Sequence, residues 1–367
     1  MRVLTGIGGL AILVTTVGSI LRNLIVPRGV DSILIRTLWR ITHGILHTAA
    51  RPLRTYLAKD KLLAWLAPIV LLATLLWWLA AFFLAYGLLL YAVSRLSLAD
   101  SLREAGSSLF TLGFASTRRN QLTVIDFAAA VTGPLVIALQ IAYLPTLYNA
   151  YNRRETEVTL LQSRASEPAW GPELLARQAL VGTVDELGGL YANWERLAAD
   201  LGESHSNYTI LLAFRSPRPY RSWIIALLAV MDAGALHMAL APTASTTPAA
   251  RLMVRAGFTA LRDIARVLRI PFDSDPDPDA AIALTYEEFA EGVAWIENAG
   301  FLAERSVEEA WPHFRGWRIN YEQIAYALAR LVDAVPAMWS GERDWPAAPL
   351  PPIRPVDRKP TKPSATS

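Results

Sequence analysis

The sequence predicts an all-α membrane protein with three transmembrane helices, joined to an all-α soluble domain. Two long stretches, residues 62–94 and 127–152, contain no charged residue. Each exceeds the roughly 20 apolar residues that a helix needs to cross a bilayer. Between them lies a polar segment that is too short to cross, which suggests that it re-enters the membrane from one side. The second half of the chain has apolar residues at helical spacing and no strand pattern of useful length.

A further span is predicted at the start of the chain, in residues 1–26. Residues 3–21 carry no charge, and Arg22 closes this apolar run. Two interpretations stay open, a retained transmembrane helix and a cleaved signal peptide. The retained helix is favoured, because Arg2 is the only basic residue before the run and no clear cleavage site of small residues follows it.

Basic residues at the ends of the spans predict the orientation. The connection between the first two spans is rich in arginine and lysine, whereas the segment around the polar loop has few of them. Cytoplasmic loops carry the excess of basic residues in membrane proteins. We therefore expect the first connection and everything after Arg153 to be cytoplasmic, with the polar loop on the outer side.

The first connection, residues 27–61, is predicted to hold an amphipathic helix. Apolar residues lie near helical spacing, with Arg36 and Arg40 between them. Such a helix lies in the headgroup plane of the bilayer, so membrane lipid is an expected partner. His43 and His47 are one helical turn apart, but no third ligand is near them, so we predict no metal site.

Residues 153–343 are predicted to form a cytoplasmic helical domain. Two capping-box signatures mark helix starts within it, Thr285 with Glu288 and Ser306 with Glu309. Residues 223–240 are almost apolar enough for another span, but charged or polar groups interrupt them, and a buried helix of a soluble bundle is favoured. Residues 344–367 are rich in proline and are predicted to be a disordered tail.

The composition argues against several classes of protein. The chain has no cysteine, which excludes disulfides and thiolate chemistry. Its net charge of +3 comes without a basic stripe, so nucleic acid is not an expected partner. It also lacks the serine-hydrolase elbow, the His-Glu-x-x-His zinc motif and a phosphate-binding glycine loop. We therefore expect neither an enzyme nor a bound cofactor.

The polar segment has the pattern of a loop that lines an ion pathway. A span, a short helix, a Thr-x-Gly-aromatic-small motif and a second span follow one another at residues 62–94, 99–110, 111–115 and 127–152. Ion filters of this kind replace the water shell of the ion with backbone carbonyls, and glycine permits the backbone angles that this requires.

This arrangement resembles the pore module of the two-transmembrane pore-loop potassium channel family, whose filter reads Thr-Val-Gly-Tyr-Gly. The likeness lies within a pore module predicted at residues 62–152, with its pore loop at residues 99–116. By this resemblance the ion-selectivity filter consists of Thr111, Leu112, Gly113, Phe114 and Ala115. Ala115 stands at the second glycine of the family filter, and Ser116 replaces its usual aspartate. A Cβ at a normally left-handed position costs roughly 1 kcal/mol or more, which leaves selectivity open.

The resemblance also implies residues that line or gate the pore. Gly133 with Pro134 is a candidate hinge, and Pro145 a candidate bend beside Tyr143 and Tyr148. Gln140 lies at mid-depth, where a polar side chain is expected to face water or another subunit. Two alternatives stay open: the prolines kink the helix without gating, and Gln140 packs between helices.

The resemblance implies a homotetrameric cation channel of the bacterial inner membrane. The permeant monovalent cation is expected to be K+, and the cytoplasmic domain is expected to regulate conduction. Around residues 214–219 and 309–317, that domain resembles the C-terminal regions that accompany such atypical pores, which leaves an unknown small ligand open. The alternative function is a non-conducting, membrane-tethered regulatory or scaffold protein with a degenerate pore module.

Overall fold

The computed structural model describes residues 2–25, 33–115 and 120–353 of the 367-residue chain. Throughout these residues the regular structure is helical, apart from two isolated β-bridges. The all-α prediction is therefore confirmed. The chain divides into two compact units: Met1–Asn152 with Ser204–Arg215, and Arg153–Glu203 with Ser216–Ser367.

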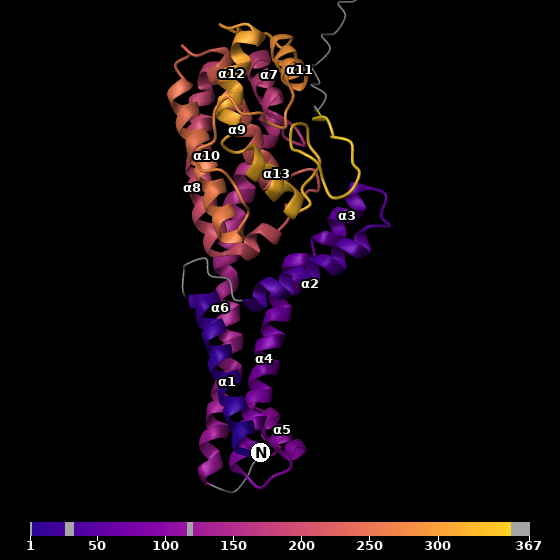
Figure 1. The fold of residues 1–367 in the computed structure, drawn as a ribbon, viewed down its shortest axis with the longest axis vertical. Coiled ribbons are helices and arrows are strands. Elements are labelled where there is room, and N and C mark those ends of the chain that lie inside the picture. Colours follow the sequence, from indigo (N-terminus) through magenta and orange to yellow (C-terminus); the bar gives the residue numbers. More distant parts are fainter. Residues whose placement is uncertain (1, 26–32, 116–119, 354–367) are drawn as a thin grey trace, which may run out of the picture. The chain divides into compact units, whose positions relative to one another are not determined.

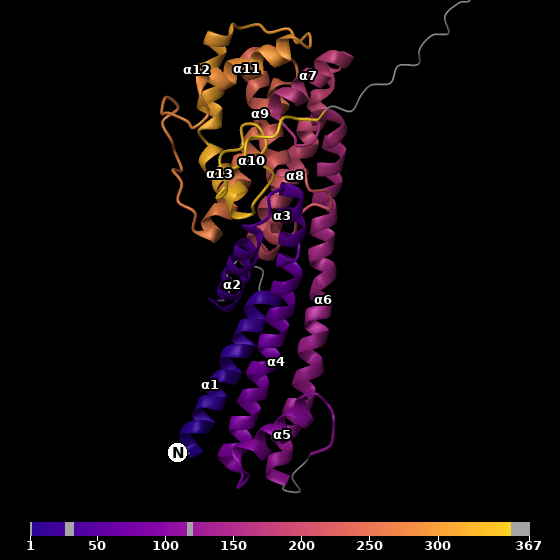
Figure 2. The same cartoon turned by 90° about the vertical axis from the view of Figure 1, so that its right-hand side faces the viewer.

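The first unit contains three long helices and several short ones. Figures 1 and 2 show α1, α4 and the first part of α6 as long neighbouring helices, with the short α5 at the end where α1 begins. The elements are α1 (Arg2–Ile20) with the π-helical turn η1 (Leu21–Ile25), α2 (Ile33–Ala50), α3 (Tyr56–Leu63), α4 (Leu66–Val93), α5 (Leu98–Leu109), α6 (Asn120–Ala165) and the 3-10 turn η3 (Thr209–Ala213).

Helices α1 and α4 pack closely and run antiparallel. A Cβ on Gly9 would lie 2.9 Å from the carbonyl oxygen of Ala85, so only glycine allows this approach of the two backbones. Further along α1, the Trp78 indole donates a hydrogen bond of 3.2 Å to Ser19 Oγ. Small residues at the contact are typical of helices that associate in a membrane, where close van der Waals packing drives the association.

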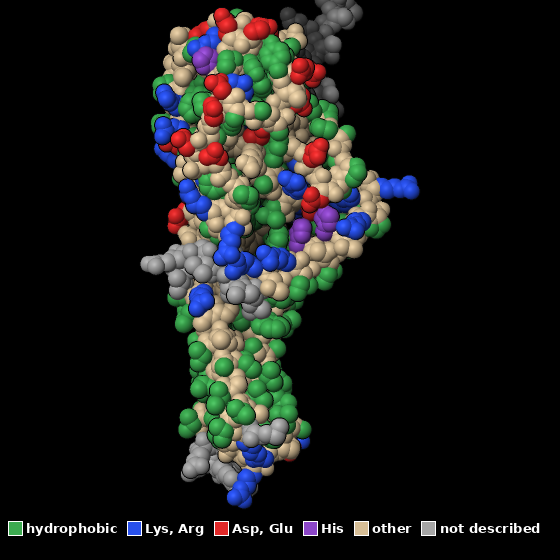
Figure 3. Space-filling view, in the orientation of Figure 1, with side chains coloured by type: hydrophobic (Ala, Val, Ile, Leu, Met, Phe, Trp, Pro, Cys, Tyr) green, Lys and Arg blue, Asp and Glu red, His purple; other side chains and the backbone are tan. Residues whose placement is uncertain are grey.

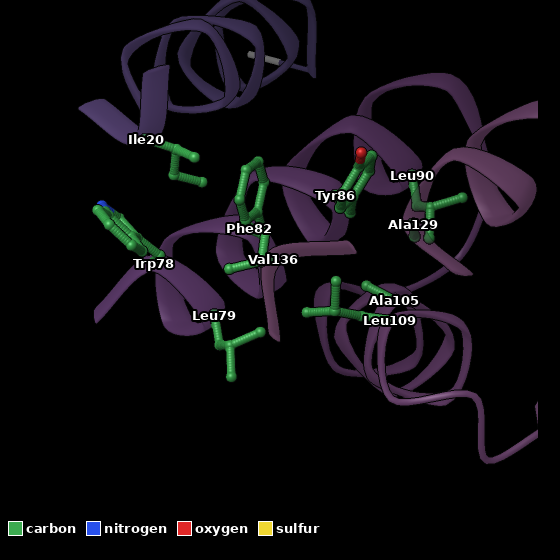
Figure 4. Close-up of a cluster of buried hydrophobic side chains, with 10 residues drawn as sticks. All are labelled: Ile20, Trp78, Leu79, Phe82, Tyr86, Leu90, Ala105, Leu109, Ala129 and Val136. Atoms are coloured by element: carbon green, nitrogen blue, oxygen red, sulfur yellow. The ribbon is translucent and has the colours of Figure 1, made fainter. Parts of the chain in front are cut away.

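An apolar cluster joins α4 to α5 and α6. Figure 4 shows its side chains converging from four helices. Its members are Ile20 from α1, Trp78, Leu79, Phe82, Tyr86 and Leu90 from α4, Ala105 and Leu109 from α5, and Ala129 and Val136 from α6. This cluster fixes α5 against the ends of two long helices.

A second apolar cluster brings a distant segment into the first unit. Residues Leu211 and Ala213 of η3 pack against Val70 of α4 and Leu147 of α6. Just after η3, Arg215 Nε forms an ion pair of 2.6 Å with Asp60 of α3. No local pattern signals this return of residues 204–215, because it depends on contacts such as this ion pair, between residues 155 positions apart.

Among the residues that the structure describes, four helical stretches are long and apolar enough to cross a membrane: Arg2–Ile25, Tyr56–Val93, Thr123–Ala165 and Trp223–Leu240. In the first three, 17%, 39% and 22% of the most apolar window is buried, whereas Trp223–Leu240 is buried throughout. On the face shown in Figure 3, hydrophobic side chains cover the α1, α4 and α6 part of the first unit. This apolar exterior is consistent with a membrane protein.

The second unit is a helical bundle built around α9 (Trp223–Leu240). Contacts with α7, α10, α12 and α13 surround α9, which explains its complete burial. The other elements are the end of α6, α7 (Gly171–Val181), η2 (Val184–Glu186), α8 (Leu187–Asn207), α10 (Thr247–Leu268), α11 (Tyr286–Glu297), α12 (Val307–Arg318) and α13 (Glu322–Leu331). Both predicted capping boxes are present, at the starts of α11 and α12.

A buried charge network explains the aspartate within apolar α9. Arg318 of α12 is completely buried and forms an ion pair of 2.6 Å with Asp232 and one of 2.8 Å with Glu322. It also donates to the carbonyl of Trp339 at 2.7 Å, and Tyr321 donates to Asp232 at 2.8 Å. Buried charges persist only when paired and hydrogen-bonded, and this network meets that condition.

The start of the predicted disordered tail is ordered. Leu350 N donates a hydrogen bond to the carbonyl of Pro336 at 2.7 Å, and Ile353 N donates to the carbonyl of Glu167 at 2.9 Å. The proline content of this stretch therefore does not prevent a defined path, because backbone contacts to the bundle fix it. The rest of the predicted tail, residues 354–367, lies outside the described residues.

Candidate functional site

The short helix expected at residues 99–110 is α5, Leu98–Leu109. Ser97 caps it by accepting a hydrogen bond from Asp100 N at 3.1 Å. Asp100 in the first turn complements the positive end of the helix dipole. The inner face of α5 mixes small, polar and apolar buried residues: Ser101, Glu104, Ala105, Ser107 and Leu109. It includes the carboxylate of Glu104, whereas the buried residues of α1 and α4 include no charged side chain.

Glycines on both neighbouring helices make room for α5. A Cβ on Gly133 of α6 would lie 2.0 Å from the carbonyl oxygen of Leu109, and one on Gly87 of α4 would lie 2.4 Å from a methyl of Leu102. Gly133 thus has a packing function at the end of α5. Helix α6 continues through Pro134 and Pro145 without interruption, so the hinge and the bend stay predictions.

The predicted filter segment folds back onto the end of α5. Leu112 N and Gly113 N both donate to the carbonyl of Ser107, at 2.8 and 3.3 Å. Ala115 N donates to the hydroxyl of the same serine at 3.0 Å. These bonds satisfy groups at the C-terminus of the helix, as capping turns commonly do. Ser107 therefore holds the loop in place.

The left-handed residues of this loop are Thr111, with φ of 56°, and Gly113, with φ of 70°. Sequence reasoning expected the strain at Ala115 instead, by alignment with an extended filter strand. The difference arises because the loop is a helix-capping turn, in which the first residue beyond the helix often adopts the left-handed conformation. A Cβ in this conformation costs Thr111 about 1–2 kcal/mol.

The apolar side chains of the loop point outward. Leu112 is 62% exposed and Phe114 is 58% exposed. The guanidinium of Arg103 lies 5.4 Å from the ring centroid of Phe114. One loop of this size cannot surround an ion, so any ion site at Gly113 requires loops from several copies of the chain.

Two carboxylates behind the loop were missed by sequence reasoning. Ser108 Oγ donates to Asp126 Oδ1 of α6 at 2.9 Å. Glu104, only 4% exposed, lies on the inner face of α5 and interacts with Asp126. The available signal was the position of Glu104 on the buried face of an amphipathic helix. These residues connect the end of α5 to α6.

The predicted gate residues lie near the other end of the first unit. Tyr143 packs edge-to-face on Tyr208 with ring centroids 5.7 Å apart, and Tyr148 packs on Phe214 at 5.9 Å. Both partners belong to the segment Ser204–Arg215, which thus contacts the predicted gate. Pro145 lies on the exposed side of α6.

Gln140 faces the interior of its own protomer. It is 6% exposed and lines a cavity between α6 and α4. The exposed side of α6 is instead apolar and includes Val131 (65% exposed), Leu135 (53%) and Ile141 (61%). The structure therefore agrees better with the alternative in which Gln140 packs between helices. A pore-lining position for Gln140 stays an untested prediction.

The described part of the chain contains no group of three or more His, Cys, Asp or Glu side chains placed to hold a metal ion. His43 stacks between Trp39 and His47, at 4.8 and 5.7 Å. In α12, Trp311 packs on Phe289 of α11 with ring centroids 5.1 Å apart, so this tryptophan takes part in helix packing.

Over residues 2–25, 33–115 and 120–353, the fold and the site define an all-helical protein with four helices long and apolar enough to span a membrane. Comparisons with known proteins find no family model, no curated protein and no solved structure that matches it.

Proposed function

We propose that the protein is a pore-loop cation channel in which several copies bring their residues 111–115 around one axis. The observation on which the proposal rests is the packing of α5. A short helix with a partly polar inner face packs between two long apolar helices at one end, and a glycine-containing loop follows it. Carbonyl oxygens of such loops from neighbouring copies are suited to replace the water of a monovalent cation, with K+ as the expected ion.

The exposed face of α6 supports assembly from several copies. It leaves large apolar side chains uncovered, including Phe127, Val131 and Leu135. In an assembled pore, part of this face contacts neighbouring subunits and part lines the pathway below the loop. The number of copies, four, follows from the resemblance to potassium channels.

The distribution of basic residues supports the proposed orientation. The loop and the start of α1 lie at one end of the first unit, and α2 and α3 lie at the other. By the positive-inside rule, the basic first connection supports a cytoplasmic location for the second end and for the second unit, in the proposed setting of a bacterial inner membrane. Residues 204–215 contact Tyr143 and Tyr148, so a movement of this segment acts directly on the proposed gate residues.

A second function is a tethered regulatory or scaffold protein that does not conduct. The turn conformation of residues 111–115 favours it, because potassium filters use an extended strand with inward carbonyls. Ala115, which stands where the family filter has its second glycine, also favours a protein that does not conduct.

Cation flux into liposomes, with a matched pair of glycine variants, tests the proposal. Gly113 and Gly182 both have a left-handed φ, 70° and 69°, and open space where a side chain would point. Both Gly→Ala changes therefore cost about the same, 1–2 kcal/mol. We expect K+ flux from the wild type, flux altered severalfold or a changed K+/Na+ ratio in Gly113→Ala, and wild-type flux in Gly182→Ala.

The mass of the purified particle completes the test. A tetramer of the 40.4 kDa chain together with flux supports the channel. A monomer without flux in any variant refutes the channel and favours the scaffold.

A further inference from the structure

A small cavity of about 40 Å³ lies within the first unit. Its walls come from η1, α4, α6, the start of α2 and residues 207–210. A single water needs about 10–15 Å³ by this measure, so the cavity has room for roughly three non-hydrogen atoms. Polar side chains in the lining include Arg22, Asn23, Thr74, Gln140, Asn207 and Thr209. Apolar side chains in the lining include Leu24, Val70 and Trp78.

The inner part of the cavity presents hydrogen-bond acceptors. Gln140 Oε1 is buried and accepts no hydrogen bond from any residue that the structure describes. Thr74, 4% exposed, donates its hydroxyl proton to the carbonyl of Val70 at 2.7 Å, so its oxygen offers only lone pairs. A buried acceptor without a donor costs about 1–3 kcal/mol. Gln140 Oε1 therefore favours an occupant that donates a hydrogen bond to it.

One cationic side chain, Arg22, lines the cavity, which lies at the expected boundary of the hydrocarbon. Arg22 closes the apolar run of α1 and is exposed. Helix α2, whose Ile35 lines the same cavity, carries Arg36 and Arg40. Its outer face exposes Ile41 (54%) and Ile45 (62%), as expected for a helix that lies in the headgroup region. An occupant with a phosphate is suited to these basic residues.

We propose that this cavity binds an anionic phospholipid with a phosphoglycerol headgroup. Its phosphate lies against Arg22, and a terminal hydroxyl enters the cavity and donates to Gln140 Oε1. A hydroxyl is favoured over the ammonium of ethanolamine, because a second cation beside Arg22 is repelled. Choline is excluded since it has no donor. The hydroxymethyl end of glycerol also matches the space available. The proposal requires a membrane around the first unit but not conduction.

Native mass spectrometry of the full-length protein in detergent tests the site. Phosphatidylglycerol, phosphatidylserine and phosphatidylcholine with identical acyl chains are added in turn. We expect phosphatidylglycerol to be retained about tenfold more than either of the other lipids, and this retention to fall about tenfold in Arg22→Gln and in Gln140→Leu. The control Arg95→Gln removes an equally exposed arginine near the far end of α4 and is expected to leave retention unchanged.

Thermal stability separates loss of the site from loss of the fold. Gln140→Leu removes the unsatisfied acceptor, so without lipid it is expected to melt at or above the wild-type temperature. Phosphatidylglycerol is then expected to raise the melting temperature of the wild type and not that of the variant. Equal retention of all three lipids, or wild-type retention by Gln140→Leu, overturns the proposal. Soluble glycerol 3-phosphate that stabilises the wild type as well as the lipid does would also overturn it, by showing a free phosphate ester as the ligand.

Discussion

The two units of the molecule differ in how their buried polar side chains are satisfied. In the first unit, hydroxyls bond to their own helix: Thr16, Thr74 and Thr132 each donate to the carbonyl four residues earlier, at 2.7 Å. In the second unit, Arg318 of α12 joins residues of α9, α13 and a loop in one buried charge network. Bonds between helices in the first unit also occur, as between Trp78 and Ser19 and between Tyr86 and Thr132. Gln140 Oε1 has no such partner among the described residues, and it marks the cavity that Arg22 also lines.

The packing of the two units shares one device and differs in another. Glycines allow close approach in both, as Gly9 and Gly133 illustrate in the first unit and Gly171 in the second, where an added Cβ would lie 2.7 Å from the Cβ of Asp232. The core of the second unit also contains a connected group of large aromatic side chains: Trp170, Phe289, Phe314 and Trp339. Aromatic burial gains most when water is the alternative, whereas in lipid close backbone contact contributes more.

The largest expected effect comes from breaking the charge network of the second unit. Arg318→Met leaves Asp232 and Glu322 buried without their cation, which costs about 3–5 kcal/mol. We expect a large fall in the melting temperature of the second unit, followed by tryptophan fluorescence. Arg266→Met is the control, because its pair with Asp263 is exposed and contributes little. Equal shifts in both variants would show that the network adds no more than a surface pair.

A smaller effect is expected from overfilling a contact of the first unit. Gly133→Ala places a methyl group against the carbonyl of Leu109, and such overpacking costs about 1–3 kcal/mol. The melting temperature in detergent is the measurement. Gly18→Ala, on α1 with no atom close to where the added methyl group would lie, is expected to be neutral or slightly stabilising. If Gly133→Ala is equally benign, α5 is not held as tightly as described.

The smallest effect concerns a surface contact of the second unit. Thr243 donates to Glu304 through its hydroxyl at 2.6 Å and its backbone N at 3.1 Å. These bonds lower the pKa of Glu304 below its ordinary value of 4.5. The folded pKa is the lower one, so this stability is complete above pH 4.5 and is lost as the pH falls through the folded pKa.

Thr243→Val removes the stronger of the two bonds. We expect the variant to lose less stability than the wild type between about pH 7 and pH 3, as measured by melting temperature. Thr259→Val serves as the control, because Thr259 bonds only to its own helix, at Arg255. Parallel pH profiles for Thr243→Val and the wild type would contradict the assignment.

Local patterns in the sequence predict much of this fold. The uncharged stretches coincide with α4 and α6, the polar segment holds α5, and the capping boxes start α11 and α12. These features depend on residues a few positions apart. The pairing of Asp60 with Arg215 depends on the tertiary fold, and so does the direction in which Gln140 points. The left-handed backbone of Thr111 was also not predicted. Alignment with the family filter implies an extended strand at residues 111–115, whereas these residues form a turn.

The return of residues 204–215 has a consequence for dissecting the protein. The chain passes between its two units three times, at positions 152–153, 203–204 and 215–216. One protease cut at any of these junctions leaves the two units joined through the other two. Truncation after Asn152 would also strip away the segment that covers Tyr143 and Tyr148. A minimal membrane fragment must therefore be built as a fusion, with residues 204–215 reattached through a linker.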